Sequence, residues 1–427
     1  MLQVGNVQDN LKEYVEALGK RGIKNAQELL DEVIALDSVR KKTQQELDDV
    51  KAQSNQLAKQ IGQLFKEGKK DEAEKAKQET AQLKERDKAL SEQMNATQEA
   101  LLQKLYNIPN IPHPSVPAGK SEEDNEVVKL DDSNKPALYA DAKPHWDLIA
   151  EYDIIDFELG NKVTGAGFPF YKGAGARLVR ALVNYFLDEA QKAGFNEVQT
   201  PILINEDSGY GTGQLPDKEG QMYGITDSNL FLIPTAEVPI TNIYRDVIVS
   251  EDQLPIKHAG YTPCFRREAG SWGAHVRGLN RLHQFDKVEI VQITKPENSY
   301  DVLDEMVAHV EQLVKNLGLP YRILRLCGGD LGFTSALTYD FEVYSAAQEK
   351  WLEVSSVSNF ETFQANRLKL RYKDASNKKA LAHTLNGSAL AVPRILAAIL
   401  ENNQTETGID IPEVLRTYTG FDRITKG

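Results

Sequence analysis

Cysteine is nearly absent from this sequence, since the 427 residues contain only Cys264 and Cys327. Two cysteines exclude a disulfide framework and cannot form a zinc site by themselves, so they indicate a reducing compartment. No run of about 18 apolar residues occurs, and no basic, apolar and small-residue signal opens the chain. We therefore expect a cytoplasmic protein that neither crosses nor enters a membrane.

Positive charge is also scarce, with 50 Lys and Arg against 63 Asp and Glu and a net charge of −13. A protein that binds nucleic acid needs cationic surface to displace the counterions of phosphates. The deficit is uneven, however: residues 1–110 hold 18 basic and 19 acidic residues, and the remainder holds 32 and 44. The charge balance therefore argues against RNA binding only weakly and leaves a basic N-terminal face open.

The first hundred residues predict a small helical start over 1–25 and then a long helical hairpin. Apolar residues recur every three to four positions in two seams, the first from Val33 to Leu64 and the second from Ala73 to Leu101. Residues 66–70 (KEGKK) interrupt the pattern between them. Such an antiparallel coiled coil would be roughly 55–60 Å long. It would serve either as a structural or dimerising rod, or as a phosphate-binding arm through the lysines at and beside its tip: Lys59, Lys66, Lys69, Lys70, Lys75 and Lys77.

Proline ends this hairpin. The string NIPNIPHP at 107–114 cannot continue a helix, and residues 115–144 are polar and acidic. We accordingly predict three parts: a coiled-coil arm over 1–110, a linker over 111–144, and a second domain over 145–427.

The second domain predicts alternating helices and strands. Apolar periodicity indicates helices over 175–190 and 301–318, and β-rich runs indicate strands over 198–203, 321–326 and 351–360. A glycine-rich stretch at 208–216 is expected to be a mobile loop. Near the C-terminus, we expect a strand to turn through residues 386–388 into an apolar helix, with Asn386 and Ser388 available as helix caps.

Residues 262–291 are the most informative stretch. They predict two strands joined by a loop that carries glycines and cations, among them Trp272, His275 and Arg277. Arg266 directly follows the first strand, and Glu289 lies in the second. An arginine fork beside a carboxylate suits a ligand that carries both an anionic and an ammonium group, although an ordinary surface hairpin would look similar.

The strings in this stretch, FRREAGSWG at 265–273, RG at 277–278 and HQFDKVE at 283–289, resemble motif 2 of the class II aminoacyl-tRNA synthetases in its seryl form. Residues 175–201 resemble motif 1 and residues 386–394 motif 3. The strings TAE at 235–237 and FQANR at 363–367, together with the leading arm, also follow this family's order. The resemblance thus covers essentially the whole chain. It implies an α+β fold, with an antiparallel sheet flanked by helices behind an N-terminal antiparallel coiled-coil arm.

The resemblance also implies the activity and the partners. Family members activate L-serine with ATP and Mg²⁺ and transfer the seryl group to the 3′ end of tRNA(Ser), with tRNA(Sec) as a further candidate acceptor. In the family, the arm reaches the long variable arm of the tRNA, motif 1 lies at a homodimer interface, and the 208–216 loop is a lid.

Carried over residue by residue, the resemblance assigns catalytic roles to Arg266 and Arg394. It implies that serine is bound by Thr235, Ala236, Glu237, Arg266, Glu289, Asn386 and Ser388. It implies that ATP is bound by Arg266, Arg267, Glu268, Leu282, Phe285, Glu353, Val354, Ser355, Ser356 and Arg394. Glu353 and Ser356 would hold Mg²⁺ between themselves and the phosphates, and Phe285 would stack on adenine.

Two departures concern the motif 2 loop, where Arg267 stands in place of a common serine and residues 272–276 (WGAHV) are atypical. Two alternative functions remain open. A relative that loads an amino acid onto a carrier protein would lack the arm. A catalytically dead RNA-binding relative would be expected to lose Arg266, Arg394, Glu353 or Ser356, all of which are present. The sequence leaves open whether Glu237 or Glu289 meets the ammonium group of serine.

Overall fold

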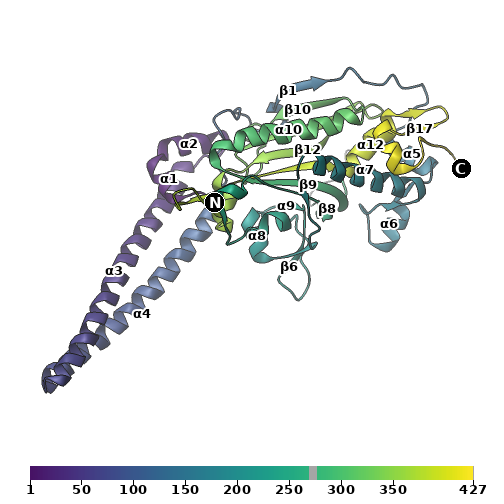
Figure 1. The fold of residues 1–427 in the computed structure, drawn as a ribbon. Helices are drawn as coiled ribbons and strands as arrows, with labels where there is room; N and C mark the ends of the chain where they lie inside the picture. Colours follow the sequence, from purple (N-terminus) through teal and green to yellow (C-terminus); the bar gives the residue numbers. More distant parts are fainter. Residues whose placement is uncertain (269–276, 427) are drawn as a thin grey trace. The chain divides into compact units, whose positions relative to one another are not determined.

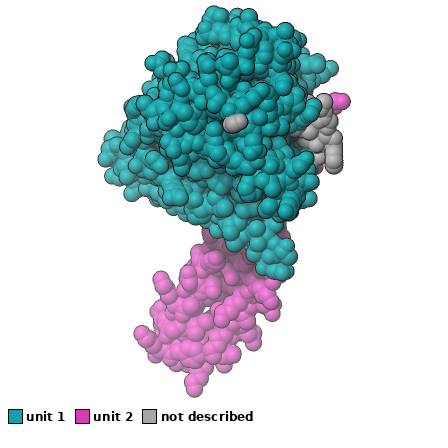
Figure 2. All heavy atoms as spheres, turned by 90° about the vertical axis from the view of Figure 1, so that its right-hand side faces the viewer, with its two compact units in different colours: residues 1, 20–22, 110–427 teal, residues 2–19, 23–109 magenta. Residues whose placement is uncertain are grey.

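The structure of this protein is a computed structural model that describes residues 1–268 and 277–426 (Figure 1). The expectations for Trp272 and His275 lie outside these residues. The chain forms two compact units: Met1, Lys20–Gly22 and Asn110–Gly427 make up unit 1, and Leu2–Gly19 with Ile23–Pro109 make up unit 2 (Figure 2). Within the described part of the chain, no helix has the length and apolar character needed to cross a bilayer.

Unit 2 is the predicted helical hairpin. Its helices are α1 (Val4–Asp9), α2 (Leu11–Lys20), α3 (Ala26–Lys66) and α4 (Lys70–Tyr106). The seams pack as expected, with Leu47 and Val50 of α3 against Leu90 of α4, and Leu64 against Ala73 nearer the tip. The α3–α4 turn needs glycine, because Gly68 has a φ of +77°.

Unit 1 is built on one large sheet of eight strands, in the spatial order β1-β10-β11-β12-β15-β9-β8-β4. In that order the strands are β1 (Glu126–Asp131), β10 (Tyr321–Arg325), β11 (Leu337–Ser345), β12 (Lys350–Asn359), β15 (His383–Ala391), β9 (Gln284–Thr294), β8 (Ile256–Phe265) and β4 (Asn196–Glu197). Every neighbouring pair is antiparallel except β4 and β8. The expected antiparallel α+β architecture is therefore confirmed.

The two faces of the sheet differ (Figure 1). Three amphipathic helices, α7 (Gly173–Lys192), α10 (Ser299–Asn316) and α12 (Val392–Asn402), pack on one face and bury the main core, which includes Val288, Ile290 and Leu385. The short helices α8 (Glu206–Thr212), α9 (Glu237–Asn242) and α11 (Thr362–Leu368) pack together and contact β9 and β15. These short helices therefore cover part of the second face of the sheet.

Smaller elements complete unit 1. The helices are η1 (Glu122–Asp124), α5 (His145–Glu151), α6 (Phe157–Val163), η2 (Glu251–Gln253), η4 (Pro296–Asn298) and α13 (Glu413–Thr419). The strands are β2 (Ile155–Asp156), β3 (Phe170–Tyr171), β5 (Leu203–Asn205), β6 (Leu230–Leu232), β7 (Ile248–Ser250), β13 (Arg371–Lys373), β14 (Lys379–Leu381), β16 (Gln404–Thr405), β17 (Gly408–Asp410) and β18 (Arg423–Ile424).

Three local expectations were wrong, two of them in the segment before β6. The strand expected over 198–203 is interrupted, because residues 198–202 are irregular and Pro201 has no N–H to donate to a ladder. The expected loop at 208–216 begins as helix α8, capped by Asn205 and ended by Gly213. Its glycines permit close packing, since a Cβ at Gly211 would lie 2.6 Å from the Leu368 side chain.

The third correction concerns residues 386–388, which do not form a turn. Asn386 and Ser388 lie inside β15, and α12 begins only after Ala391, with no side-chain cap.

Residues 111–144, expected to be a linker, belong to unit 1 and contain β1, which pairs with β10 along the sheet edge.

Candidate active site

Strand alternation places the central polar residues on one face of the sheet. Lys287 and Glu289 are two residues apart in β9 and therefore face the same side. Ser388 of β15 lies opposite Glu289, and Asn386, two residues earlier, shares its face. The polar face of the sheet thus collects residues from two strands that are almost a hundred positions apart in sequence.

A register shift brings the expected metal ligands to that same face. Ser356 pairs with Asp340 and Glu353 pairs with Glu342, with a β-bulge in between. Because Asp340 and Glu342 are two apart in β11, their partners Ser356 and Glu353 also share a face, although they are three apart in β12. Ser356 Oγ donates to Asp340 Oδ1 at 2.5 Å. These groups offer only oxygen atoms, which suits Mg²⁺ bound together with phosphates.

Thr235, Lys287 and Glu289 form a buried triangle. Thr235 Oγ1 donates to Glu289 Oε2 at 2.7 Å and accepts from Lys287 Nζ at 2.8 Å, and Lys287 forms an ion pair with Glu289. Asn386 Nδ2 lies 3.4 Å from the other Glu289 oxygen. All three members of the triangle are almost fully buried. A buried charge is tolerated when it is paired in this way, and the result is a compact polar cluster.

Glu237 is the second buried carboxylate. Gln364 Nε2 donates to Glu237 Oε1 at 2.6 Å, and Gln364 Oε1 accepts from Thr384 Oγ1 at 2.8 Å, which fixes the orientation of the amide. Burial, together with the negative charge of Glu289, raises the pKa of Glu237 to about 7. Glu237 and Glu289 thus differ in their electrostatic partners: Glu289 has a lysine, whereas Glu237 has a neutral amide.

Arg266 lies close enough to Glu237 for its charge to act on that carboxyl group. It directly follows β8, its Nε lies 3.4 Å from the Pro234 carbonyl, and its guanidinium lies 5.3 Å from the centre of the Phe285 ring. Behind it, Cys264 is fully buried, and burial raises the pKa of its thiol. Arg266 therefore presents a cation between the Thr235 turn and an aromatic face.

Arg394 lies beside the other polar cluster. It is in the first turn of α12, donates from Nη1 to the Glu353 carbonyl at 2.7 Å, and lies 3.7 Å from Glu353 Oε2. Its Nε donates to the Asn280 carbonyl at 2.9 Å. The structure thus brings together Arg394 and Glu353, two residues that the resemblance assigned to ATP binding.

The remaining predicted site residues are either buried or bonded to other groups of the protein. Leu282 and Val354 are buried in the main core, so any contact with ATP would come from their backbones. Ser355 Oγ donates to the Ser388 carbonyl at 2.6 Å and links β12 to β15. Three further residues were also expected to contribute. Ala236 is fully buried, and Glu268 forms an ion pair with Arg281 at 3.2 Å, whereas the backbone N–H of Arg267 donates to Gln221.

Sequence reasoning missed three residues of these clusters: Lys287, Gln364 and Asp340. Lys287 could have been found from strand alternation, because it lies two positions before Glu289. Gln364 was noted only as part of the FQANR string. Asp340 had no signal of its own, because its partner Ser356 depends on the β11–β12 register.

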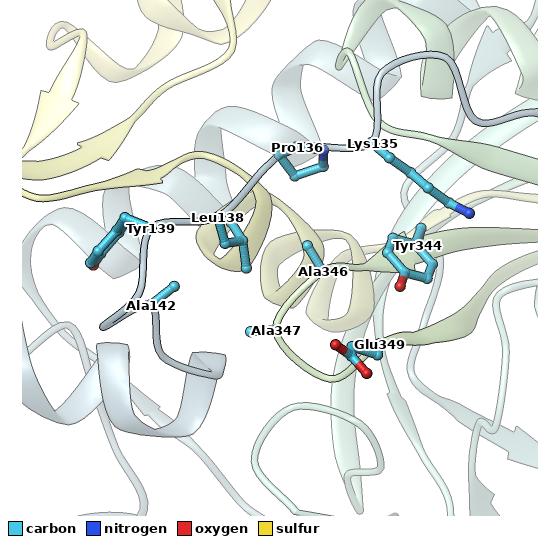
Figure 3. A pocket seen from close by; sticks show the side chains of 9 residues that line it. All are labelled: Lys135, Pro136, Leu138, Tyr139, Ala142, Tyr344, Ala346, Ala347 and Glu349. Atoms are coloured by element: carbon cyan, nitrogen blue, oxygen red, sulfur yellow. The ribbon is translucent and has the colours of Figure 1, made fainter.

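A separate cavity of about 460 Å³ lies between residues 135–142 and the turn that joins β11 to β12 (Figure 3). It is lined by Lys135, Pro136, Leu138, Tyr139, Ala142, Tyr344, Ala346, Ala347 and Glu349. None of the predicted site residues lines this cavity.

Two sequence families match the chain. Residues 1–112 match the seryl-tRNA synthetase N-terminal domain, and residues 223–403 match the tRNA synthetase class II core domain (G, H, P, S and T). The serine–tRNA ligase of Salinibacter ruber is 50% identical over 429 residues, which cover 99% of both chains. The serine–tRNA ligase of Exiguobacterium sibiricum is 45% identical over the full length of both.

Two solved structures of serine–tRNA ligases have the same fold as this chain. Seryl-tRNA synthetase from Pyrococcus horikoshii, complexed with ATP, superposes with a TM-score of 0.91 at 32% identity and covers all of both chains. The cytoplasmic serine–tRNA ligase of Naegleria fowleri, in complex with AMP, has a TM-score of 0.86 at 26% identity over 100% of this chain and 99% of its own.

Proposed function

This chain belongs to the seryl-tRNA synthetase family of class II, whose members are serine–tRNA ligases, and from this premise we propose how its own residues carry out the reaction. Serine would be activated with ATP to seryl-adenylate and then transferred to the terminal ribose of tRNA(Ser), with tRNA(Sec) as a second candidate. The observation that carries the assignment of the site is the buried triangle of Thr235, Lys287 and Glu289 beside Arg266.

In the first step, a serine carboxylate oxygen attacks the α-phosphorus of ATP and pyrophosphate leaves. Both partners are anions, so catalysis consists mainly of positioning and charge neutralisation. Arg266 bridges the serine carboxylate and the α-phosphate, which fits its placement beside the Thr235 turn. Phe285 stacks on adenine. The Arg266 guanidinium over the Phe285 ring fits these two roles, because it brings the carboxylate site and the base site together.

Arg394 neutralises charge on the β- and γ-phosphates, and a Mg²⁺ ion bound beside it would add to this effect. Glu353 and Ser356 would hold the ion through oxygen atoms. Ser356 donates its hydroxyl hydrogen bond to Asp340, which leaves the Oγ lone pairs available to a metal. The ion supplies electrostatic stabilisation of the departing pyrophosphate.

The two buried carboxylates select serine. Glu237, Glu289 and Thr235 receive its ammonium and hydroxyl groups, and Asn386 and Ser388 close the pocket. A pocket that must hydrogen-bond a hydroxyl rejects alanine by a large factor, about 10⁴ or more, because its buried polar groups would be left unpaired. Threonine is excluded because its extra methyl group crowds the same walls.

We assign tRNA recognition to the coiled-coil arm over residues 1–110 and chemistry to residues 145–427. We further assign a homodimer interface that includes the 175–201 segment, and a cytoplasmic location like that named for the Naegleria relative. The dimer is measured directly by sedimentation of the purified chain, and a single species at the monomer mass of 47.7 kDa would contradict it.

The experiment that tests the activity is ATP–pyrophosphate exchange without tRNA, with serine, alanine, threonine and glycine as alternative substrates. Exchange with serine alone is expected. Addition of tRNA(Ser), tRNA(Sec) or a carrier protein then identifies the acceptor, because only the true acceptor receives radiolabelled serine. Absence of exchange with all four amino acids would overturn the assignment.

A further inference from the structure

Two fully buried side chains outside the predicted site, His145 at the start of α5 and Glu401 near the end of α12, form a hydrogen-bonded pair. Glu401 Oε1 lies 2.7 Å from His145 Nδ1 and also accepts the backbone N–H of His145 at 2.9 Å. Ser345 donates to the second oxygen of Glu401. Although burial alone would raise it, the hydrogen bonds from His145 and Ser345 hold the pKa of Glu401 below its usual value.

The other nitrogen of His145 holds the backbone at the C-terminal end of the motif 2 loop. His145 Nε2 accepts the backbone N–H of Leu279 at 2.8 Å, which places the imidazole proton on Nδ1, where it is donated to Glu401. The packing is so close at the preceding residue that a Cβ on Gly278 would lie 2.3 Å from His145 Nε2. Gly278 also has a φ of +66°, which favours glycine.

The first turn of α5 makes a second contact with the same end of the loop, through Trp146. The Arg277 guanidinium lies 4.9 Å from the centre of the Trp146 ring, and Trp146 packs edge-on against His145. Residues 277–279 are therefore held by two adjacent side chains of one helix.

This backbone in turn holds Arg394. The Asn280 carbonyl accepts Arg394 Nε at 2.9 Å, and the Asn280 amide donates to Gln348 at 2.9 Å. Gln348 donates to Glu401 Oε1 at 2.9 Å, and Glu401 follows Arg394 on α12 by about two turns. The hydrogen bonds thus close a ring that starts and ends on α12 and passes through the loop end.

We propose that His145 and Glu401 are positioning residues for ATP, which fix the loop end at 278–280 and, through it, the Arg394 guanidinium. Neither side chain touches the nucleotide. The proposal rests on the assignment of Arg394 to the phosphates of ATP.

The test compares His145→Leu and Glu401→Gln with the unaltered chain in serine-dependent exchange and in direct calorimetric titration with ATP. We expect the KM and Kd for ATP to rise about tenfold or more, as is typical when a side chain that orients a ligand-binding group is removed. The KM for serine should change less than twofold, because the contacts that hold Thr235, Lys287 and Glu289 together involve neither His145 nor Glu401. Equal losses for ATP and serine, or no change for ATP, would overturn the proposal.

Two controls separate positioning from general damage. His383→Asn removes another buried histidine, whose partner is Ser299 at 2.8 Å, and should lower Tm without raising the KM for ATP. In an Arg394→Ala background, His145→Leu should raise the KM for ATP little further, since the group that it positions is gone. An additive effect would contradict the proposed route. If the proposed function itself is wrong, the unaltered chain will show no serine-dependent exchange. This result is distinct from a failure of the positioning proposal, in which the unaltered chain is active.

Discussion

Glu353 and Ser356 face the same side of the sheet although they are three positions apart in one strand. Regular alternation would place them on opposite faces, because side chains in a strand repeat every two residues. The β-bulge opposite Phe341 and Glu342 adds one residue to β12 between them and restores a common face. The bulge therefore brings the two proposed Mg²⁺ ligands to one face of the sheet while keeping both on a strand.

The first prediction concerns the metal. Ser356→Ala removes one proposed Mg²⁺ ligand and leaves Asp340 without its hydrogen-bond donor. We expect the Mg²⁺ concentration that gives half-maximal exchange to rise about tenfold. Titration of exchange with MgCl₂ at saturating serine measures this value.

A matched control is Ser358→Ala, which removes a buried hydroxyl on the same strand whose partner is Thr338. This variant should keep the Mg²⁺ requirement of the unaltered chain. An unchanged Mg²⁺ requirement in Ser356→Ala would show that Ser356 is not a metal ligand.

The second prediction concerns pH. The pKa of Glu237 is raised from its ordinary value of 4.5 to about 7 by burial and by Glu289. Between these two values the folded chain keeps a proton that the unfolded chain has released, so the free energy of unfolding falls as pH rises through this window. Glu237→Gln should remove that fall, which is at most about 3 kcal/mol. Urea unfolding at pH 5 and pH 8 measures the difference.

The same proton distinguishes the two carboxylates in catalysis. If the serine ammonium binds Glu237, the carboxyl must ionise, so the KM for serine should fall as pH rises toward 8, and Glu237→Gln should abolish this dependence. A pH-independent KM for serine in the unaltered chain would assign the ammonium to Glu289, which already carries a paired charge.

Sequence patterns were sufficient for features set by local periodicity. The two seams, over 33–64 and 73–101, lie within α3 (Ala26–Lys66) and α4 (Lys70–Tyr106), because the packing of a coiled coil is set by local apolar periodicity. The antiparallel sheet and an apolar helix after residue 391 were likewise foreseen, through the resemblance of residues 262–291 and 386–394 to the class II motifs.

Features that depend on partners distant in sequence could not be foreseen. The glycines at 209 and 211 suggested a mobile loop, whereas they serve close packing against Leu215 and Leu368. Strand alternation could have placed Lys287 beside Glu289, but it could not show that Thr235, 52 residues earlier, would accept a hydrogen bond from Lys287. The His145–Glu401 pair joins two helices 256 residues apart, and neither string carries a local sign of it.

The third prediction concerns Arg266. Arg266→Ala removes the only proposed bridge between the serine carboxylate and the α-phosphate, and should lower kcat/KM for exchange by about 10³-fold, with tRNA binding largely unchanged. Arg267→Ser is the matched control at the neighbouring position, because it introduces the serine that is common in this family. Its kcat/KM for exchange should fall far less than that of Arg266→Ala. Loss of tRNA binding together with exchange in Arg266→Ala would refute the division of roles between arm and catalytic domain.

The fourth prediction removes most of the arm. Deletion of residues 30–102, with a short Gly-Ser joint, takes away most of the α3–α4 hairpin, which packs mainly on itself through its seams. Serine-dependent exchange should survive, and charging of tRNA(Ser) should be lost. Undiminished charging by the shortened chain would show that the arm has no part in tRNA recognition.

The last prediction asks whether the tip of the arm binds phosphates. Lys66, Lys70 and Lys75 are exposed near the α3–α4 turn, whereas Lys69 and Lys77 already pair with glutamates. Removal of one lysine–phosphate interaction lowers the slope of log Kd against log salt by roughly 0.7 to 0.9, so changing the three lysines to glutamate should reduce it by about 2 or more. Electrophoretic mobility shifts with tRNA(Ser) over a series of salt concentrations measure the slope. The same change at Lys373, Lys378 and Lys379, which are equally exposed on unit 1, should leave it unaltered. A reduction of equal size in both variants would mean that tRNA senses only the net charge of the chain, and the arm would then be a structural rod.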